Sequence, residues 1–126
     1  MGRRNTGLVG QRAEQFAFDY LRQHSLQPVA RNFHRRGGEI DLIMLDDGCL
    51  TFIEVRYRAS TDFVAPVETV EYHKQRKIIR TAAMFVAKNR RYAAHTMRFD
   101  VVAIQGAEMP SVTWIKDAFR PNNSSL

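Results

Sequence analysis

The fold is decided by the stretch GEIDLIM (residues 38–44) together with LTFIEV (residues 50–55). Both runs consist mainly of β-branched, aromatic and other large apolar residues, which is typical of buried strands. Between them, Asp46-Asp47-Gly48 is turn chemistry, because Asp tolerates tight turns and Gly adopts a positive φ. The sequence therefore predicts a β-hairpin that carries carboxylates inside apolar strands.

The register of this hairpin determines which charged side chains meet. In one register Asp41 lies opposite Ile53, and the charges are scattered among Ile and Val. A loop one residue longer sets Asp41 opposite Glu54, and Glu39 opposite Arg56. We favour this second register because it collects all four charges on one face, where directly opposite side chains lie within about 5.5 Å.

Asp41 and Glu54 together predict a site for a divalent cation. An ionised carboxylate in an apolar strand is costly unless a cation compensates its charge, and carboxylate oxygens are preferred ligands of Mg²⁺ and Mn²⁺. The alternative is a set of internal ion pairs between carboxylates and an arginine across the hairpin. Glu39 has the same two interpretations, as an outer-shell acid or as the partner of Arg56.

This pattern resembles the active-site core of the PD-(D/E)XK nucleases, in which an Asp is followed by a hairpin and a Glu-x-Lys triplet. Asp41 and Glu54-Val55-Arg56 occupy those positions. More of the chain is similar to the small bacterial YraN-like proteins, which resemble archaeal Holliday junction resolvases. The similar segments are GQRAE (10–14), ARNF (30–33), GGEIDLI (37–43), FIEVRYR (52–58), RFDVVAI (98–104) and WIKDAF (114–119).

The resemblance implies an α/β, restriction-endonuclease-like domain, with a mixed β-sheet flanked by helices. It implies an endonuclease that uses Mg²⁺ or Mn²⁺ to hydrolyse phosphodiester bonds in DNA, branched DNA included. The backbone carbonyl of Val55 would join Asp41 and Glu54 as a metal ligand. Glu14 on the first helix would complete the acidic cluster, although a solvated residue paired with a nearby Arg is an equal alternative. Junction resolvases are dimers, so a homodimer is one expected assembly.

Arg56 departs from the superfamily pattern, which has lysine at this position. Arginine stays protonated and cannot act as a base, but it can hold a phosphate oxygen and stabilise the charge of a transition state. Two functions therefore stay open. One is a nuclease in which the metal alone activates water, and the other is a non-catalytic nucleic-acid-binding protein that retains the nuclease fold.

The charge balance favours a polyanionic partner. The 126 residues include 19 Lys and Arg but only 13 Asp and Glu, and the isoelectric point is near 10.0. Nucleic acid is expected rather than a membrane, because no amphipathic basic helix stands out. The candidate phosphate contacts are Arg31, Arg35, Arg36, Arg58, Lys74 and Arg80. Related nucleases aim a lysine from the second helix at the site, which matches Lys74; an ordinary solvated basic surface is the alternative.

Apolar residues at helical spacing predict helices from about residue 7 to 24 and from about residue 70 to 89. Strands are predicted at 28–33, in the hairpin and at 98–104, with an edge strand at 112–115. A helix between two buried strands predicts a parallel βαβ crossover. The hairpin is expected to be covered on both sides. Ile40, Leu42 and Met44 are assigned to one of its faces, and Ile43, Ile53 and Val55 to the other.

The size of the chain predicts a single domain at residues 1–120, followed by a disordered tail at 121–126. Residues 59–66 are predicted to be a loop. Cys49 is the only cysteine, so an intrachain disulfide is excluded. With no signal peptide and no apolar run of membrane-spanning length, the cytoplasm is the expected location.

Overall fold

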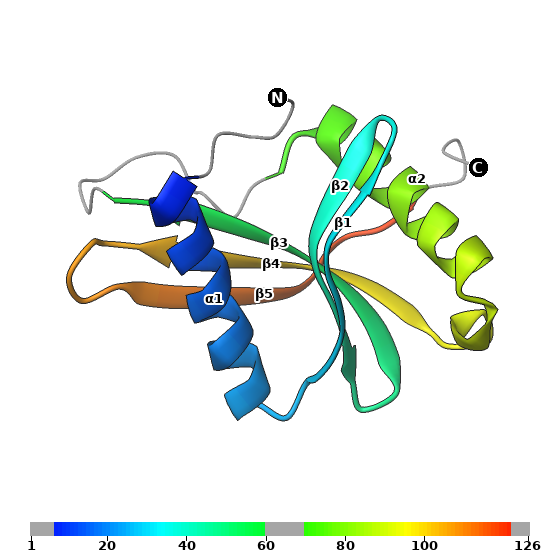
Figure 1. The fold of residues 1–126 in the computed structure, drawn as a ribbon, viewed down its shortest axis with the longest axis horizontal. Coiled ribbons are helices and arrows are strands. Elements are labelled where there is room, and N and C mark those ends of the chain that lie inside the picture. Colours follow the sequence, from blue (N-terminus) through cyan, green and yellow to red (C-terminus); the bar gives the residue numbers. More distant parts are fainter. Residues whose placement is uncertain (1–6, 60–69, 122–126) are drawn as a thin grey trace.

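A computed structural model describes residues 7–59 and 70–121. They form a five-stranded sheet with one helix on each face (Figure 1). The elements are α1 (Gly7–Gln23), β1 (Gln27–Arg35), β2 (Gly38–Asp46), β3 (Cys49–Arg58), α2 (Tyr72–Lys88), the short 3₁₀ helix η1 (Arg90–Tyr92), β4 (Met97–Gln105) and β5 (Ser111–Phe119). The predicted fold class, a mixed α/β sheet flanked by helices, is confirmed.

The strands lie in the order β1-β2-β3-β4-β5, which is also their order in the chain. Only β3 and β4 are parallel, and α2 connects them. The predicted βαβ crossover is therefore confirmed. The edge strand β5 is antiparallel to β4 and longer than predicted.

The predicted register of the hairpin is confirmed, although its turn is shorter than expected. The β2–β3 ladder runs from Leu42 paired with Ile53 to Asp46 paired with Cys49, which places Asp41 toward Glu54. The loop is only Asp47-Gly48, with φ of 53° and 87°. Two positive φ angles suit a tight hairpin turn whose twist matches that of the strands. Asp46, expected in the turn, therefore extends the strand.

The predicted division of the hairpin into two faces was wrong. Ile53 and Val55 lie with Leu42 and Met44 on the α1 side, because directly paired residues of antiparallel strands project to the same face. Ile40 is buried with Ile43 on the α2 side. Residues three apart cannot share a face of a regular strand. The alternation of β2 is therefore interrupted next to Asp41.

Each helix buries a narrow stripe against the sheet. In α1, Ala13 and Ala17 let the helix approach closely, and Leu21 is fully buried. In α2, the buried residues are Ile78, Thr81, Ala82 and Phe85. Among the described residues, no helix combines the length and the apolar character needed to span a membrane.

The β1–β2 hairpin rests on α2 through a close contact at Gly38. A Cβ atom built at Gly38 would lie 2.2 Å from the Thr81 hydroxyl oxygen and 3.3 Å from the Lys77 carbonyl oxygen. Glycine is therefore required for this approach of strand to helix. The contact holds the tip of the hairpin beside the middle of α2.

A separate buried carboxylate, Asp100, connects β4 to the edge strand β5. Its two oxygens accept hydrogen bonds of 2.9 Å from the Arg98 guanidinium, the Trp114 indole and the backbone N–H of Asp117. The hydrogen bonds to Asp100 raise the pKa of Arg98 further above its ordinary value. These contacts hold β4 to β5 across the irregular register between Phe99 and Val101. We interpret Asp100 as structural.

The predicted loop at 59–66 and the predicted tail at 121–126 lie almost wholly outside the described residues.

Candidate metal and nucleic-acid site

The site begins where β2 and β3 separate (Figure 1). The last pair of their ladder is Leu42 with Ile53, and Asp41 and Glu54 are the next residues on the two strands. An Asp41 carboxylate oxygen accepts a hydrogen bond of 2.8 Å from the Val55 N–H. The Asp41 side chain thus accepts a hydrogen bond that a backbone carbonyl of the neighbouring strand would otherwise accept. This bond holds Asp41 against β3. Both residues are buried, with exposed fractions of 3% for Asp41 and 7% for Glu54.

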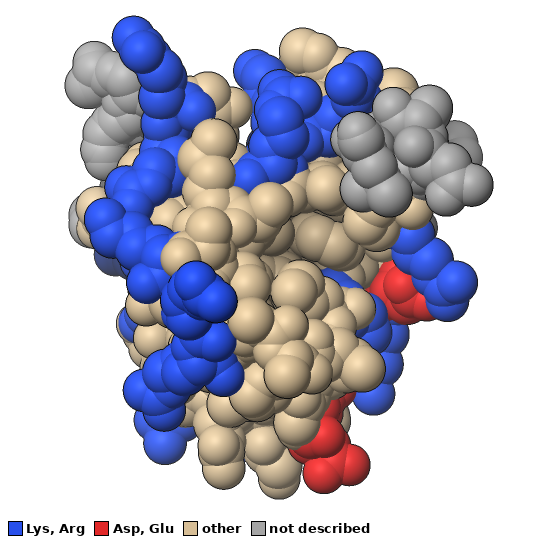
Figure 2. Space-filling view, turned by 90° about the vertical axis from the view of Figure 1, so that its right-hand side faces the viewer, with Lys and Arg blue, Asp and Glu red and all other residues tan. Residues whose placement is uncertain are grey.

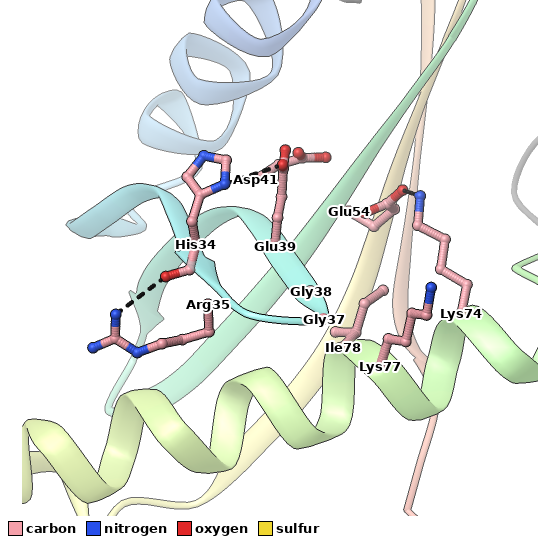
Figure 3. Close-up of a pocket in the computed structure, with 10 residues that line it drawn as sticks. All are labelled: His34, Arg35, Gly37, Gly38, Glu39, Asp41, Glu54, Lys74, Lys77 and Ile78. Atoms are coloured by element: carbon pink, nitrogen blue, oxygen red, sulfur yellow. Dashed lines mark hydrogen bonds and ion pairs between the residues drawn. The ribbon is translucent and has the colours of Figure 1, made fainter. Parts of the chain in front are cut away.

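Asp41 and Glu54 open onto a pocket of about 340 Å³ between the β1–β2 hairpin and α2 (Figure 3). The pocket is lined by His34, Arg35, Gly37, Gly38, Glu39, Asp41, Glu54, Lys74, Lys77 and Ile78. Its carboxylates come from the sheet, whereas its lysines come from α2. The pocket therefore has an acidic wall and a basic wall.

Lys74 connects these two walls. Its ammonium nitrogen lies 2.7 Å from a carboxylate oxygen of Glu54, and Figure 3 shows the two side chains turned toward each other. Lys74 lies in the first turn of α2, as predicted. The neighbouring Gln75 instead donates a hydrogen bond of 2.8 Å to the Val70 carbonyl before the helix. Of these two neighbouring residues, only Lys74 lines the pocket.

Glu39 faces His34 on the neighbouring strand. The two residues are paired between β1 and β2, and the His34 Nδ1 atom lies 3.4 Å from a Glu39 carboxylate oxygen. His34 and Lys77 were not predicted as parts of the site, but both line the pocket. Counting outward from a turn at Arg36-Gly37 would have placed His34 opposite Glu39.

Two predicted members of the site are not among the residues that line the pocket. Arg56 is partly buried two residues beyond Glu54, and it does not line the pocket. Glu14 is buried on α1, with an exposed fraction of 8%, and does not line the pocket either. This burial argues against the alternative of a solvated helix residue. The pocket lining thus includes Asp41, Glu54 and Glu39, but not the whole predicted cluster.

The predicted phosphate contacts fall into two groups. Arg35 and Lys74 line the pocket, while Arg36 and Arg80 are exposed on the adjoining turn and on α2. The other two lie apart from the pocket lining. Arg31 lies over the Phe18 ring of α1, with 4.4 Å from its guanidinium carbon to the ring centroid. Arg58, at the end of β3, has a buried Nε atom that makes no hydrogen bond within the described part of the chain.

The donor set suits one kind of metal ion better than others. Within residues 7–59 and 70–121, no three His, Cys, Asp or Glu side chains are grouped closely enough to hold an ion together. A cage built wholly of protein side chains is therefore not supported. Mg²⁺ needs no such cage, because it usually retains waters and takes one or two carboxylates plus substrate phosphates. The buried carboxylates of Asp41 and Glu54 fit that mode, and the ammonium beside Glu54 shows that this carboxylate accepts a cation.

The fold and the pocket define a small mixed α/β domain with two buried carboxylates at the point where two strands separate. The sequence model of the uncharacterised protein family UPF0102 matches residues 13–104, and the chain belongs to this family. The matched segment includes every residue that lines the pocket.

Similar family members come from several bacteria. A UPF0102 protein of Photobacterium profundum is 46% identical over 106 residues, which cover 83% of this chain and 84% of that protein. One from Coxiella burnetii is 44% identical over 113 residues, covering 90% and 92%. One from Pseudomonas putida is 40% identical over 113 residues, covering 88% and 92%. Family membership is thus shown, whereas the wider placement among PD-(D/E)XK nucleases stays a prediction.

Proposed function

We propose that this protein is a Mg²⁺- or Mn²⁺-dependent endonuclease of the PD-(D/E)XK type, which hydrolyses phosphodiester bonds in DNA and acts on branched DNA. One observation carries the proposal: Asp41 and Glu54 are buried at the positions that follow the last pair of the β2–β3 ladder, and both line a pocket whose opposite wall is basic. The similarity of Asp41 and Glu54-Val55-Arg56 to the superfamily motif supports it.

In this proposal, Asp41 and Glu54 hold the metal ion with the help of the Val55 carbonyl. When bound, such an ion stabilises charge on phosphoryl oxygens and lowers the pKa of a bound water. The hydrogen bond from the Val55 N–H keeps the Asp41 carboxylate in place before the ion arrives. That preorganisation reduces the cost of assembling the site.

Lys74 supplies the pocket with the lysine that the motif lacks at Arg56. Its side chain is half exposed, so it can leave Glu54 and contact the scissile phosphate from the opposite wall. Arg35 and Lys77 line the same pocket and are placed to hold flanking phosphates. Arg56 does not line the pocket; in this proposal it stabilises negative charge on a phosphate oxygen at the edge of the site.

The second candidate is a non-catalytic nucleic-acid-binding protein with a nuclease fold. The ion pair between Lys74 and Glu54 favours it, because an ammonium already neutralises one proposed metal ligand. Arg56 in place of the motif lysine favours it as well. Arg56→Lys separates the two candidates: a nuclease gains cleavage activity, and a binding protein gains none.

The test of the proposal is cleavage of labelled duplex, single-stranded, flap and four-way-junction DNA in the presence of Mn²⁺. Wild type is compared with Asp41→Asn, and with Asp19→Asn as a matched control. Asp19 is an exposed aspartate of α1 that contacts Gln15. We expect wild type and the control to cleave equally, and Asp41→Asn to be slower by about 100-fold or more. Equal cleavage by all three proteins would refute the assigned site, whereas salt-sensitive binding without cleavage would favour the second candidate.

A further inference from the structure

Helix α2 carries charge of one sign only. It contains five Lys and Arg residues and no Asp or Glu. All five are exposed, and Arg90 and Arg91 of η1 continue the exposed basic surface beyond its end. The five residues of the helix are Lys74, Arg76, Lys77, Arg80 and Lys88. The sequence presents these charges as separate clusters, which the helix joins into one surface.

Helical geometry places four of the five on one side of α2. At about 100° per residue, Lys74, Lys77, Arg80 and Lys88 fall within an arc of about 120°, which we call the α2 basic flank. Figure 2 views the molecule from the side on which α2 lies, and there Lys and Arg run down one edge and gather again at the top. The acidic side chains visible from this side lie apart from that column.

The α2 basic flank starts at the candidate site and leads away from it. Lys74 and Lys77 line the pocket, whereas Lys88 is the last residue of the helix. A helix of 17 residues is about 25 Å long at 1.5 Å per residue. A polyanion held along the flank would therefore enter the pocket at one end.

The chemistry of the flank favours the backbone of a duplex over other polyanions. A membrane-surface helix needs an exposed apolar face, but the apolar stripe of α2 is buried against the sheet, and a single large apolar side chain, Met84, is exposed within the arc of the flank. Single-strand binders stack bases on aromatic side chains, and the exposed ring of Tyr72 lies outside the arc of the flank. Closely spaced cations without an apolar face for a membrane or aromatic rings for stacking suit contacts with backbone phosphates, which carry no sequence information.

We propose that one arm of a DNA duplex lies along the α2 basic flank, held through its phosphates, and leads the scissile strand into the pocket. At about 3.4 Å per base pair, the length of α2 corresponds to an arm of about seven base pairs. The choice of DNA and the position of the cut rest on the proposed function. The binding of a duplex by the flank does not depend on catalysis.

The test compares two variants that each lose three exposed positive charges. Lys77→Gln/Arg80→Gln/Lys88→Gln removes most of the flank, and Arg12→Gln/Arg22→Gln/Lys116→Gln removes the same charge from α1 and β5. Both are made in the Asp41→Asn background. Fluorescence anisotropy then measures the binding of a labelled 20-base-pair DNA duplex over a range of salt concentrations, without divalent metal.

We expect the flank variant to lose about 2.7 units of slope in the plot of log affinity against log salt, since each phosphate contact contributes about 0.9. Its affinity at moderate salt falls by about tenfold or more relative to the control variant. Equal losses in the two variants would overturn the proposal. A flank effect on phosphatidylserine vesicles or on duplex RNA, without one on DNA, would overturn it as well.

Failure of the proposed docking surface can be distinguished from failure of the proposed nuclease function. Because the assay contains no metal and uses a site variant, loss of binding by the flank variant supports the docking surface even if wild type never cleaves DNA. Conversely, if wild type cleaves DNA but the flank variant binds the duplex as well as the control variant does, the proposed docking surface is wrong and the proposed nuclease function still stands.

Discussion

Replacing Lys74 by glutamine should weaken the metal-free protein and strengthen its binding of Mn²⁺. The Lys74 ammonium lies 2.7 Å from Glu54, which makes it the cation that compensates this buried carboxylate. A metal ion at the same carboxylate must compete with that ammonium. Lys74→Gln removes the competitor and leaves Glu54 to the metal.

The size of the effect follows from the burial of the two partners. Exposed ion pairs contribute about 0.2–1 kcal/mol, whereas removing one partner of a fully buried pair costs about 3–5 kcal/mol. Here the Glu54 side chain is 8% exposed and the Lys74 side chain 50%, so the pair lies between these limits, at about 1–2 kcal/mol. Since 1.4 kcal/mol is a factor of ten, we expect Mn²⁺ affinity to rise about tenfold.

Two measurements check this prediction. Urea unfolding without metal should show Lys74→Gln less stable than wild type, and saturating Mn²⁺ should recover the loss because the ion binds the folded state. Calorimetric titration gives the Mn²⁺ affinity directly. Lys116→Gln, at an exposed lysine of β5, is the matched control and should match wild type in both. Unchanged or weaker Mn²⁺ binding by Lys74→Gln would show that the Lys74 ammonium does not compete with a metal ion at Glu54.

Two further substitutions test the scaffold. Gly38→Ala should lower the free energy of unfolding by about 1–3 kcal/mol through overpacking, since the new Cβ would lie 2.2 Å from the Thr81 hydroxyl oxygen. Urea unfolding should show a smaller loss in a Thr81→Ala background, and an equal loss would argue against the contact. Asp100→Asn should lose about 3 kcal/mol or more, because it leaves the Arg98 charge without its buried partner. Its Mn²⁺ affinity by calorimetry should stay unchanged, since Asp100 does not line the pocket, and a weakened affinity would contradict its structural role.

Much of the hairpin could be predicted because charge and burial constrain it together. The register that sets Asp41 toward Glu54 was predicted from the need to gather the buried charges, and it is confirmed. The loop length was predicted wrongly, because Asp46 is equally suited to a turn and to the end of a strand. In the structure Asp46 pairs with Cys49 and accepts a hydrogen bond from Arg98 of β4. That partner is remote in sequence, so the local pattern does not reveal it.

The change of face in β2 was not predictable from periodicity alone. Strict alternation puts Ile40 with Leu42, but in the structure Ile40 is buried with Ile43 against α2. Asn32, on the neighbouring strand between the partners of Ile40 and Leu42, adopts a φ of 51°. Asn occupies this left-handed region more readily than most residues. Nothing in the residues of β2 themselves signals the irregularity.

The candidate site could be predicted in its centre but not at its edges. Asp41 and Glu54 were identified from their places in the hairpin, and Lys74 through the family resemblance; all three line one pocket. His34 and Lys77 were missed because their place in the site depends on how β1 and α2 meet the hairpin. Glu14 was included through the family resemblance, and Arg56 through the resemblance and the hairpin register; neither of these determines which side chains line the pocket.

The most direct test of the central claim is a crystal structure grown with Mn²⁺, with an anomalous difference map calculated at the pocket. A metal ion at the proposed site should give a peak about 2–2.3 Å from carboxylate oxygens of both Asp41 and Glu54, with the Lys74 ammonium displaced from Glu54. A map without a peak there, with Lys74 still bound to Glu54 at saturating Mn²⁺, would contradict the proposed site.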